Sequence, residues 1–332
     1  MAAVTLTDVA RRAGVSLATA SRVLNGSARK PAAEIAERVR DAATELGYVP
    51  NAQAQALARS TTGLIGLVVH DIADPYFSSI AKGVQRRASE ERRQLLLAAA
   101  GPSEEAAAVS SFVAQRTGAI IMSGSRSQQV DPDLEAELTR YQANGGRVVT
   151  IGQRWLKDAG AVTIDNHGAG LELTEALIPS SSDRLVFLGG PDDNVSATDR
   201  RDGFSLALTR TGLSAVSITE NEFSVQGGYE AATALVAEFG LDGTRGLTVI
   251  AANDVMALGA IAAFRDAGLA VPEDLRVAGF ADIPFARNYS PRLTTVRLPL
   301  EGIGEMAAEL ALETGAPRII RVVGEVIRRE SA

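Results

Sequence analysis

Residues 4–26, VTLTDVARRAGVSLATASRVLNG, contain two short amphipathic segments joined by a glycine. Apolar side chains recur at helical spacing in both, at Leu6, Val9, Ala10 and Ala13 and then at Ala20, Val23 and Leu24. Gly14 stands where a sharp turn between two helices needs a positive φ. A third apolar face follows at Ile35, Val39, Ala42 and Leu46. Residues 1–48 are therefore predicted to form a three-helix unit that contains a helix-turn-helix.

The second predicted helix has a polar surface that suits DNA. Its exposed positions are expected to be Ser16, Leu17, Thr19, Ser21 and Arg22. Hydroxyl groups can donate to phosphate oxygens, and a guanidinium can hold guanine O6 and N7 in a bidentate manner. Leu17 and Ala18 offer only apolar contact, most naturally with thymine methyl groups. The alternative is a helical packing module with a Ser/Thr-rich exposed face.

Charge is distributed unevenly along the chain. Residues 1–60 hold eight Arg or Lys and five Asp or Glu, a net +3, whereas the whole chain is −7. A basic segment on an acidic body can approach the phosphates of a nucleic acid. The charge alone is a weak signal, because small surface modules often carry +3 by chance.

Composition excludes several classes of site. The chain has no cysteine and two histidines, His70 and His167, so we expect no disulfide, thiolate nucleophile or multi-histidine metal site. Arg11 and Arg12 interrupt the region where a signal peptide needs an apolar run. No stretch approaches the roughly 18 apolar residues of a membrane span. A cytoplasmic protein without cofactor, metal or membrane association is expected.

From Leu64 onward, short apolar runs alternate with amphipathic segments. The runs include LIGLVV (64–69), QLLLAA (94–99), GAIIMS (118–123) and LRVAGF (275–280). Such alternation is typical of parallel sheets built from βαβ units. About nine such units exceed one comfortable sheet, so two doubly wound subdomains are expected. Residues 49–62 precede them and have helix propensity with almost no apolar face, which predicts a linker that is helical only when held.

Residues 4–26, together with ATELGYVPNAQAQALA (43–58), resemble the headpiece of the LacI/GalR family of transcriptional repressors. The resemblance continues in order through GLVVHDIADPYFSSIAKGV (66–84), RRDGF (200–204), AANDVMALGAI (251–261) and PRLTTVRLPLEGIGEMA (291–307). It implies an all-α helix-turn-helix headpiece at 1–48, a hinge helix at 49–62 and a periplasmic-binding-protein-like α/β core at 63–332. The first subdomain is expected at about 63–164 and 294–316, and the second at about 165–293 and 317–332.

The resemblance implies a homodimer that binds a pseudo-palindromic operator in double-stranded DNA. The residues expected at the DNA are Thr5, Ser16, Leu17, Ala18, Thr19, Ser21, Arg22, Asn25 and Leu57. Leu57 matches a leucine that paired hinge helices insert into the minor groove, where unstacking a base step bends the duplex. The linker is therefore expected to become ordered on binding. The final residues VIRRESA lack the leucine heptads of a coiled coil, which favours a dimer over a tetramer.

The resemblance also implies a small-molecule effector, a sugar or sugar derivative, between the two subdomains. Open α/β sheets bind ligands at the carboxyl ends of their strands. The expected effector-binding residues are Tyr76, Phe77, Asp165, Arg200, Phe223, Asn253 and Asp282. Five of them have a structural alternative: a surface salt bridge for Arg200, a helix cap for Asn253 and core packing for the three aromatic residues.

Ala281 departs from the family pattern, which has two acidic residues after VAGF. The first acidic residue accepts hydrogen bonds from ligand hydroxyls, and an alanine side chain cannot. Because discrimination between polyols depends on paired polar groups, the site should lose it here. Either Asp282, Asp165 or Asp254 takes over the role, or the effector is not a typical sugar.

Together these patterns predict a sequence-specific repressor whose operator affinity is controlled allosterically by the effector. The alternatives are an enzyme or a solute-binding receptor on the same α/β fold. The sequence has no GxSxG, Walker A, HExxH or strand-linked GxGxxG motif, which disfavours an enzyme. A receptor would fit residues 64–332 but would require export, for which we find no signal peptide.

Overall fold

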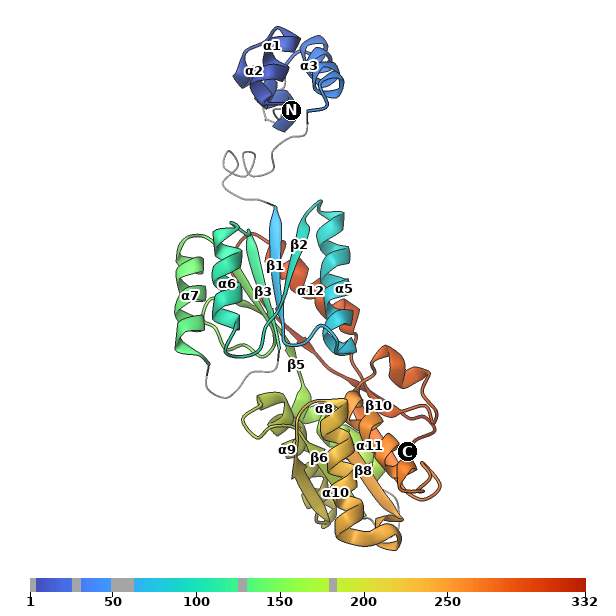
Figure 1. The fold of residues 1–332 in the computed structure, drawn as a ribbon. Helices are drawn as coiled ribbons and strands as arrows, with labels where there is room; N and C mark the ends of the chain where they lie inside the picture. The colour runs from blue at the N-terminus through green and yellow to red at the C-terminus, as the bar shows by residue number, and fades with distance from the viewer. Residues whose placement is uncertain (1–3, 26–30, 49–62, 125–129, 179–183) are drawn as a thin grey trace. The chain divides into compact units, whose positions relative to one another are not determined.

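The computed structural model describes residues 4–25, 31–48, 63–124, 130–178 and 184–332, without the side chain of Asn25. They form two compact units that divide after Gly63. The N-terminal unit consists of helices α1 (Leu6–Ala13), α2 (Leu17–Asn25) and α3 (Ala33–Glu45) (Figure 1). Its core comprises Val9, Ala10, Ala13, Ala20, Val39, Ala42 and Ala43. Gly14 has φ 64°, so the turn between α1 and α2 has the left-handed conformation that the sequence predicted.

The second unit begins with a parallel six-stranded sheet of order β11-β5-β4-β3-β1-β2. Its strands are β1 (Leu64–Val69), β2 (Gln94–Ala99), β3 (Ala119–Ser123), β4 (Arg147–Gly152), β5 (Gly160–Ile164) and β11 (Ile319–Val322). The helices around it are α5 (Pro75–Glu90), α6 (Glu105–Ala114), α7 (Pro132–Ala143) and α12 (Leu300–Leu312). Alternate strand residues face different cores: Leu67 packs in the cluster that contains residues of α5 and α12, and Val68 packs with those of α6 and α7. Helices therefore cover both faces (Figure 1).

A second six-stranded sheet of the same unit has the order β12-β10-β9-β8-β6-β7 and is parallel except for the antiparallel pair β10 and β12. Its strands are β6 (Arg184–Gly189), β7 (Ser217–Glu220), β8 (Leu247–Ala251), β9 (Arg276–Ala281), β10 (Thr294–Arg297) and β12 (Glu325–Ile327). The associated helices are α8 (Asn166–Leu177), α9 (Val195–Thr211), α10 (Val225–Thr244), α11 (Asp254–Asp266) and the 3₁₀ helix η1 (Pro284–Arg287). The second unit is thus two doubly wound subdomains.

The predicted subdomain boundaries are wrong near the C-terminal end. Residues 294–297 were assigned to the first subdomain, but β10 pairs with β9 of the second sheet. Residues 319–322 were assigned to the second subdomain, but β11 pairs with β5 of the first. The chain therefore crosses between subdomains after β5, after β10 and between β11 and β12. A strand of four residues has too little pattern to reveal which sheet it joins, because that depends on its hydrogen-bonding neighbour.

Close packing of α8 against α9 positions Asn166 and Arg200. Helices α8 and α9 cross at Gly170 and Gly203. A Cβ on Gly203 would lie 2.2 Å from the carbonyl oxygen of His167, and one on Gly170 would lie 2.6 Å from that of Arg200. Only glycine permits this approach. It brings the first residue of α8, Asn166, within hydrogen-bonding distance of Arg200 on α9.

Candidate functional site

The start of α1 is fixed by a reciprocal cap. Thr5 Oγ1 accepts from the backbone N–H of Asp8 at 3.3 Å and donates to Asp8 Oδ2 at 2.6 Å, and Asp8 Oδ2 also accepts from Thr5 N at 3.0 Å. These hydrogen bonds hold the pKa of Asp8 below its ordinary value. The hydroxyl of Thr5 is therefore engaged in capping the helix, which orients α1 for the turn that follows.

Helix α2 presents the surface predicted for DNA contact. Ser16 caps it, because Ser16 Oγ accepts from Thr19 N at 3.1 Å, and the two hydroxyls lie 2.9 Å apart. Ser16, Ala18 and Arg22 are exposed, and Leu17 keeps 50% of its surface exposed. Thr19 and Ser21 are half-buried.

The side chains of two predicted DNA contacts lie outside the described residues. Asn25 is the last residue of α2, but its side chain lies outside the described residues. Leu57 lies wholly outside them. The roles of both remain predictions from the sequence.

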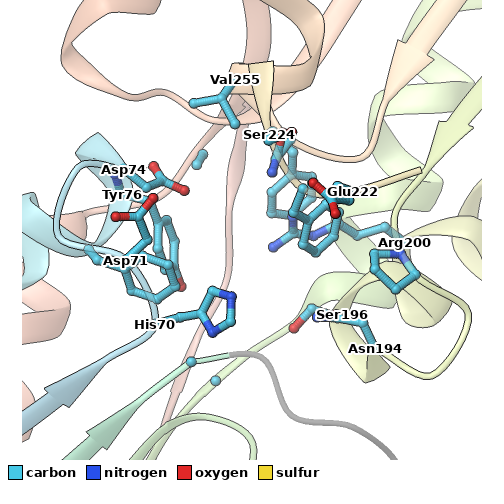
Figure 2. A pocket seen from close by; sticks show the side chains of 18 of the residues that line it. His70, Asp71, Asp74, Tyr76, Asn194, Ser196, Arg200, Glu222, Ser224 and Val255 are labelled. Atoms are coloured by element: carbon cyan, nitrogen blue, oxygen red, sulfur yellow. Dashed lines mark hydrogen bonds between the residues drawn. The ribbon is translucent and has the colours of Figure 1, made fainter. Parts of the chain in front are cut away.

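A cavity of about 500 Å³ lies between the two subdomains at the carboxyl ends of their strands (Figure 2). From the first sheet, His70 and Asp71 follow β1 and Gly152 ends β4. From the second, residues that follow β6, β7 and β8 and the last residue of β9 line the opposite side. Among its lining residues are five of the seven predicted effector-binding residues, Tyr76, Phe77, Arg200, Phe223 and Asn253. Strand ends thus create the site where a doubly wound fold binds ligands.

Arg200 is buried at the wall of this cavity and held on three sides. Its Nε donates to Asn166 Oδ1 at 2.9 Å, its Nη1 donates to the carbonyl oxygen of Ala252 at 2.6 Å, and its guanidinium carbon lies 3.8 Å from the ring centre of Phe280. Asn166 Nδ2 also donates to Ser196 Oγ at 3.2 Å, and Ser196 lines the cavity. Burial lowers the pKa of Arg200 to about 10, so it stays charged near neutral pH. Arg200 is therefore a buried cation at the cavity wall and not part of a surface salt bridge.

The other predicted residues at the cavity have mixed roles. Tyr76 and Phe77 form an edge-to-face pair with ring centres 5.0 Å apart, and burial raises the pKa of Tyr76 to about 12. The Tyr76 hydroxyl therefore keeps its proton and can donate. Asn253 caps α11, because its Oδ1 accepts from Met256 N at 2.8 Å, and it also lines the cavity. Because Oδ1 accepts this capping hydrogen bond, the side-chain NH2 of Asn253 is the donor available to a ligand.

Asp165 and Asp282 do not line the cavity, and Asp254 does not either, so none of them replaces the acid missing at Ala281. Asp165 caps α8 through Gly168 N at 3.1 Å and pairs with Arg321 of β11 at 2.7 Å. Ala281 itself lies at the cavity. The sequence could not distinguish these carboxylates, because their direction depends on strands far away in the chain.

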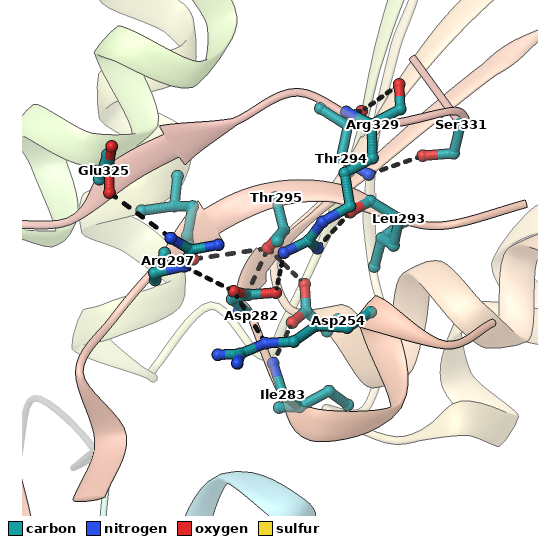
Figure 3. Close-up of polar contacts among 12 residues, drawn as sticks. Asp254, Asp282, Ile283, Leu293, Thr294, Thr295, Arg297, Glu325, Arg329 and Ser331 are labelled. Carbon is teal, nitrogen blue, oxygen red and sulfur yellow. Dashed lines mark hydrogen bonds and ion pairs between the residues drawn. The ribbon is translucent and has the colours of Figure 1, made fainter.

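Asp282 follows Ala281 but points into the second sheet (Figure 3). Its backbone has φ 54°, and its side chain is fully buried among three arginines. Arg329 Nη2 lies 2.7 Å from its carboxylate, Arg297 Nε 2.8 Å and Arg287 Nε 3.2 Å. Burial alone would raise the pKa of Asp282, but the hydrogen bonds from Arg297 and Arg329 outweigh it, and the pKa lies below its ordinary value. Asp282 therefore stabilises the end of β10 and the C-terminal segment.

Asp254 lies beside this cluster and is buried without an ion-pair partner among the described residues. It accepts from Thr295 Oγ1 at 2.6 Å and from Ile283 N at 2.8 Å. Burial raises its pKa from 3.8 to about 6. Because the folded-state pKa is raised, the protonated carboxyl stabilises the fold below about pH 4, and this contribution is lost as the pH rises through about 6.

Asp254→Asn is expected to remove this pH dependence. A shift of about two pKa units corresponds to about 3 kcal/mol. Because part of this is already lost at pH 4.5, Asp254→Asn should gain about 2 kcal/mol over the parent between pH 4.5 and pH 7.5, as measured by urea unfolding. Asp242→Asn is the matched control, because the Asp242 side chain is fully exposed. A difference between Asp254→Asn and the parent that stays constant over this range would refute the expectation.

Several cavity residues were missed by reasoning from the sequence. They are His70, Asp71, Asp74, Asp193, Asn194, Ser196, Glu222 and Ser224. Each follows a strand of the α/β core or begins the next helix. The rule that ligands bind at carboxyl ends of strands could have found them. Within the described ranges, no cluster of three His, Asp or Glu side chains could hold a metal ion.

Residues 5–51 match the model for bacterial regulatory proteins of the lacI family, and residues 174–332 match a periplasmic binding protein-like domain. The HTH-type transcriptional regulator GalR of Escherichia coli (strain K12) is 35% identical over 315 residues, which cover 93% of this chain and 88% of GalR. The Lac repressor dimer bound to operator and the anti-inducer ONPF is similar in structure, with a TM-score of 0.85, 27% identity and 99% of both chains covered. The complex of the transcriptional regulator CelR with cellobiose has a TM-score of 0.71 and 29% identity, over 99% of this chain and all of that one.

The chain belongs to the lacI family of bacterial regulatory proteins. It is a DNA-binding transcriptional regulator and not an enzyme. The predicted fold class, a helix-turn-helix headpiece with an α/β core of two subdomains, is confirmed. No helix in the described part of the chain is long and apolar enough to cross a membrane.

Proposed function

We propose that this regulator represses transcription as a homodimer on a pseudo-palindromic operator in the cytoplasm. A small-molecule effector, a sugar or sugar derivative, binds in the cavity between the subdomains and controls operator affinity. The observation that carries the proposal is the cavity itself, because its walls come from the strand ends of both sheets. The cellobiose bound to CelR supports a sugar-like ligand.

At the cavity, we assign contact with the effector to Tyr76, Phe77, Arg200, Phe223 and Asn253. The buried guanidinium and the amide group can donate to ligand oxygens, and the aromatic rings can pack against the apolar face of a sugar ring. At the headpiece, we assign the operator contacts to Ser16, Leu17, Ala18, Thr19, Ser21 and Arg22. Ser16, Leu17, Ala18 and Arg22 are exposed at the start of α2 or on it, and Thr19 and Ser21 are half-buried on the same helix.

Control of DNA binding requires that the effector and the operator each prefer one arrangement of the two subdomains. If they prefer different arrangements, the effector weakens operator binding, and if they prefer the same one, it strengthens operator binding. The effector can shift operator affinity only by its differential affinity for the two arrangements. A coupling free energy of about 1–3 kcal/mol would change operator affinity roughly 5- to 150-fold. By linkage, the operator must change effector affinity by the same factor.

The proposal is tested on the full chain. An operator is first selected from random duplexes, and effectors are found by thermal shift on a metabolite panel, since a tight ligand raises the midpoint by mass action. Operator affinity is then measured with and without the ligand, and ligand affinity with and without the operator. Equal ratios greater than about fivefold support the proposal. A ligand that binds the cavity and leaves operator affinity unchanged contradicts it.

Leu57→Ala is expected to weaken operator binding at least about tenfold. An inserted side chain compensates the few kcal/mol needed to unstack a base step, and an alanine methyl cannot. Operator affinity is measured by fluorescence anisotropy. Effector affinity without DNA should equal that of the parent, and Gln55→Ala serves as the neighbouring control in the linker. Unchanged operator affinity in Leu57→Ala would remove the insertion role.

A further inference from the structure

The side chains around the cavity carry an excess of negative charge. Asp71 and Asp74 line the side formed by the first subdomain, and Asp193 and Glu222 line the side formed by the second. Among the described residues that line the cavity, Arg200 is the only Lys or Arg. Figure 2 shows Asp71 and Asp74 across the cavity from Glu222. Among the described residues that line it, the site therefore has four carboxylates and one guanidinium.

Arg200 does not neutralise these carboxylates. Its Nε and Nη1 are committed to Asn166 and Ala252, and its face covers Phe280. Asp71 and Asp74 accept hydrogen bonds from the backbone N–H groups of residues 73 and 76, both at 2.8 Å. Burial raises the pKa of Asp74 above its ordinary value and the charge of Asp71 adds to this effect, while the hydrogen bond from Tyr76 N and the nearby His70 oppose it without cancelling it.

The two carboxylates of the second subdomain are also uncompensated. Asp193 and Glu222 are exposed, and neither takes part in an ion pair within the described part of the chain. Like charges that face one another across a cavity repel, and the repulsion grows when a ligand displaces water between them. A ligand that carries positive charge would offset this cost, and an anionic ligand would increase it.

Aromatic rings at the same cavity suit the uncharged part of the ligand. Tyr76, Phe77 and Phe223 line it, and aromatic rings can pack against the apolar face of a sugar ring. Ala281 extends the apolar wall at the position where the family has an acid. A metal ion does not fit, because the described residues contain no group of three ligands for one. The remaining candidate is an organic cation.

We propose that the effector carries a protonated amine and is an amino sugar of one or two rings. This inference rests on the proposed function and specifies the ligand class of the same cavity. The ammonium group, with three donors, binds between the carboxylates of the two subdomains, while the sugar ring packs against the aromatic side chains. A cavity of about 500 Å³ has room for a ligand of this size.

The test compares matched ligands with the full chain by calorimetry at pH 7. The pairs are D-glucosamine with D-glucose, D-galactosamine with D-galactose, and the β-1,4-linked glucosamine disaccharide with cellobiose. N-acetyl-D-glucosamine and D-glucose 6-phosphate remove and reverse the charge. At least one amine should bind ten or more times as tightly as its hydroxyl partner, and the phosphate should bind more weakly than either. A neutral sugar that binds as tightly as its amine, or a tightly bound phosphate, would overturn the inference.

Variants connect the preference to the cavity. Glu222→Gln and Asp193→Asn should each reduce the ratio of amine to neutral-sugar affinity at least about threefold, because each removes one charge and little volume. Glu238→Gln on α10 is the matched control, since Glu238 is exposed and lies outside the cavity. An unchanged ratio in both cavity variants would contradict the inference.

The two proposals fail differently. If a neutral sugar binds and shifts operator affinity while no amine binds, the proposed function stands and the amine inference falls. If amines bind with the expected preference but leave operator affinity unchanged, the ligand class stands and allosteric control falls. If no sugar on the panel binds to a chain that binds its operator, both ligand statements fall.

Discussion

Asp282→Asn is expected to lower the free energy of unfolding of the α/β core by about 3–5 kcal/mol, because it leaves buried arginine charge without a partner. The Asp282 side chain has no exposed surface, and the Arg329 side chain beside it is only 11% exposed. Asparagine keeps the shape but carries no charge, and its amide group turns donors toward the guanidinium groups. The loss should be largest for Arg329, since Arg297 and Arg287 can still reach water.

The measurement is unfolding of the full chain by denaturant, monitored by a signal that reports on the α/β core. Glu330→Gln is the matched control, because Glu330 pairs with Arg292 at 2.8 Å on the surface of the same unit, with both side chains half or more exposed. Exposed pairs of this kind contribute about 0–1 kcal/mol. A loss below about 1 kcal/mol in Asp282→Asn, equal to that of the control, would show that the three arginines do not depend on this carboxylate.

Arg200→Lys is expected to reduce effector affinity at least about tenfold, although it keeps the positive charge. A lysine cannot donate to both Asn166 Oδ1 and the carbonyl oxygen of Ala252, and its ammonium cannot stack on Phe280 as a planar guanidinium does. The cation would therefore move, and the Asn166 that also holds Ser196 would lose its partner. Each lost hydrogen bond to a charged group is worth about 1.5–3 kcal/mol.

Arg201→Lys provides the control at the next position. Arg201 pairs with Asp192 and does not line the cavity, so its replacement should leave effector affinity within about twofold. Calorimetry with the tightest ligand of the metabolite panel measures both variants, and operator affinity without ligand shows whether the headpiece remains functional. Equal effector affinity in the two variants would mean that Arg200 has a structural role only.

Much of the fold follows from local sequence. Gly14 must adopt a positive φ, Ser16 caps the helix that begins beside it, and the apolar faces of α1 to α3 meet in one core. The apolar runs from residue 64 onward became strands at the predicted places. These features depend on neighbours within a few residues, where steric limits and periodicity decide the outcome.

The cavity could be predicted only in part. Tyr76, Phe77, Arg200, Phe223 and Asn253 were identified through resemblance, and all five line it. The carboxylates that determine its charge were missed. Their position after strands makes them candidates, but the sequence does not show which of these loops meet between the two sheets.

The sequence by itself determined the helix-turn-helix, the alternation of strands and helices, and the missing acid at Ala281. Only the tertiary structure decided that β10 and β11 join opposite sheets, that Asp282 points away from the cavity into three arginines, and that Asp165 pairs with a strand of the first subdomain. The physical reason is distance along the chain. Asp282 meets Arg329, 47 residues later, and Asp165 meets Arg321, 156 residues later. Such pairs form only when the three crossings between the subdomains bring separate segments together.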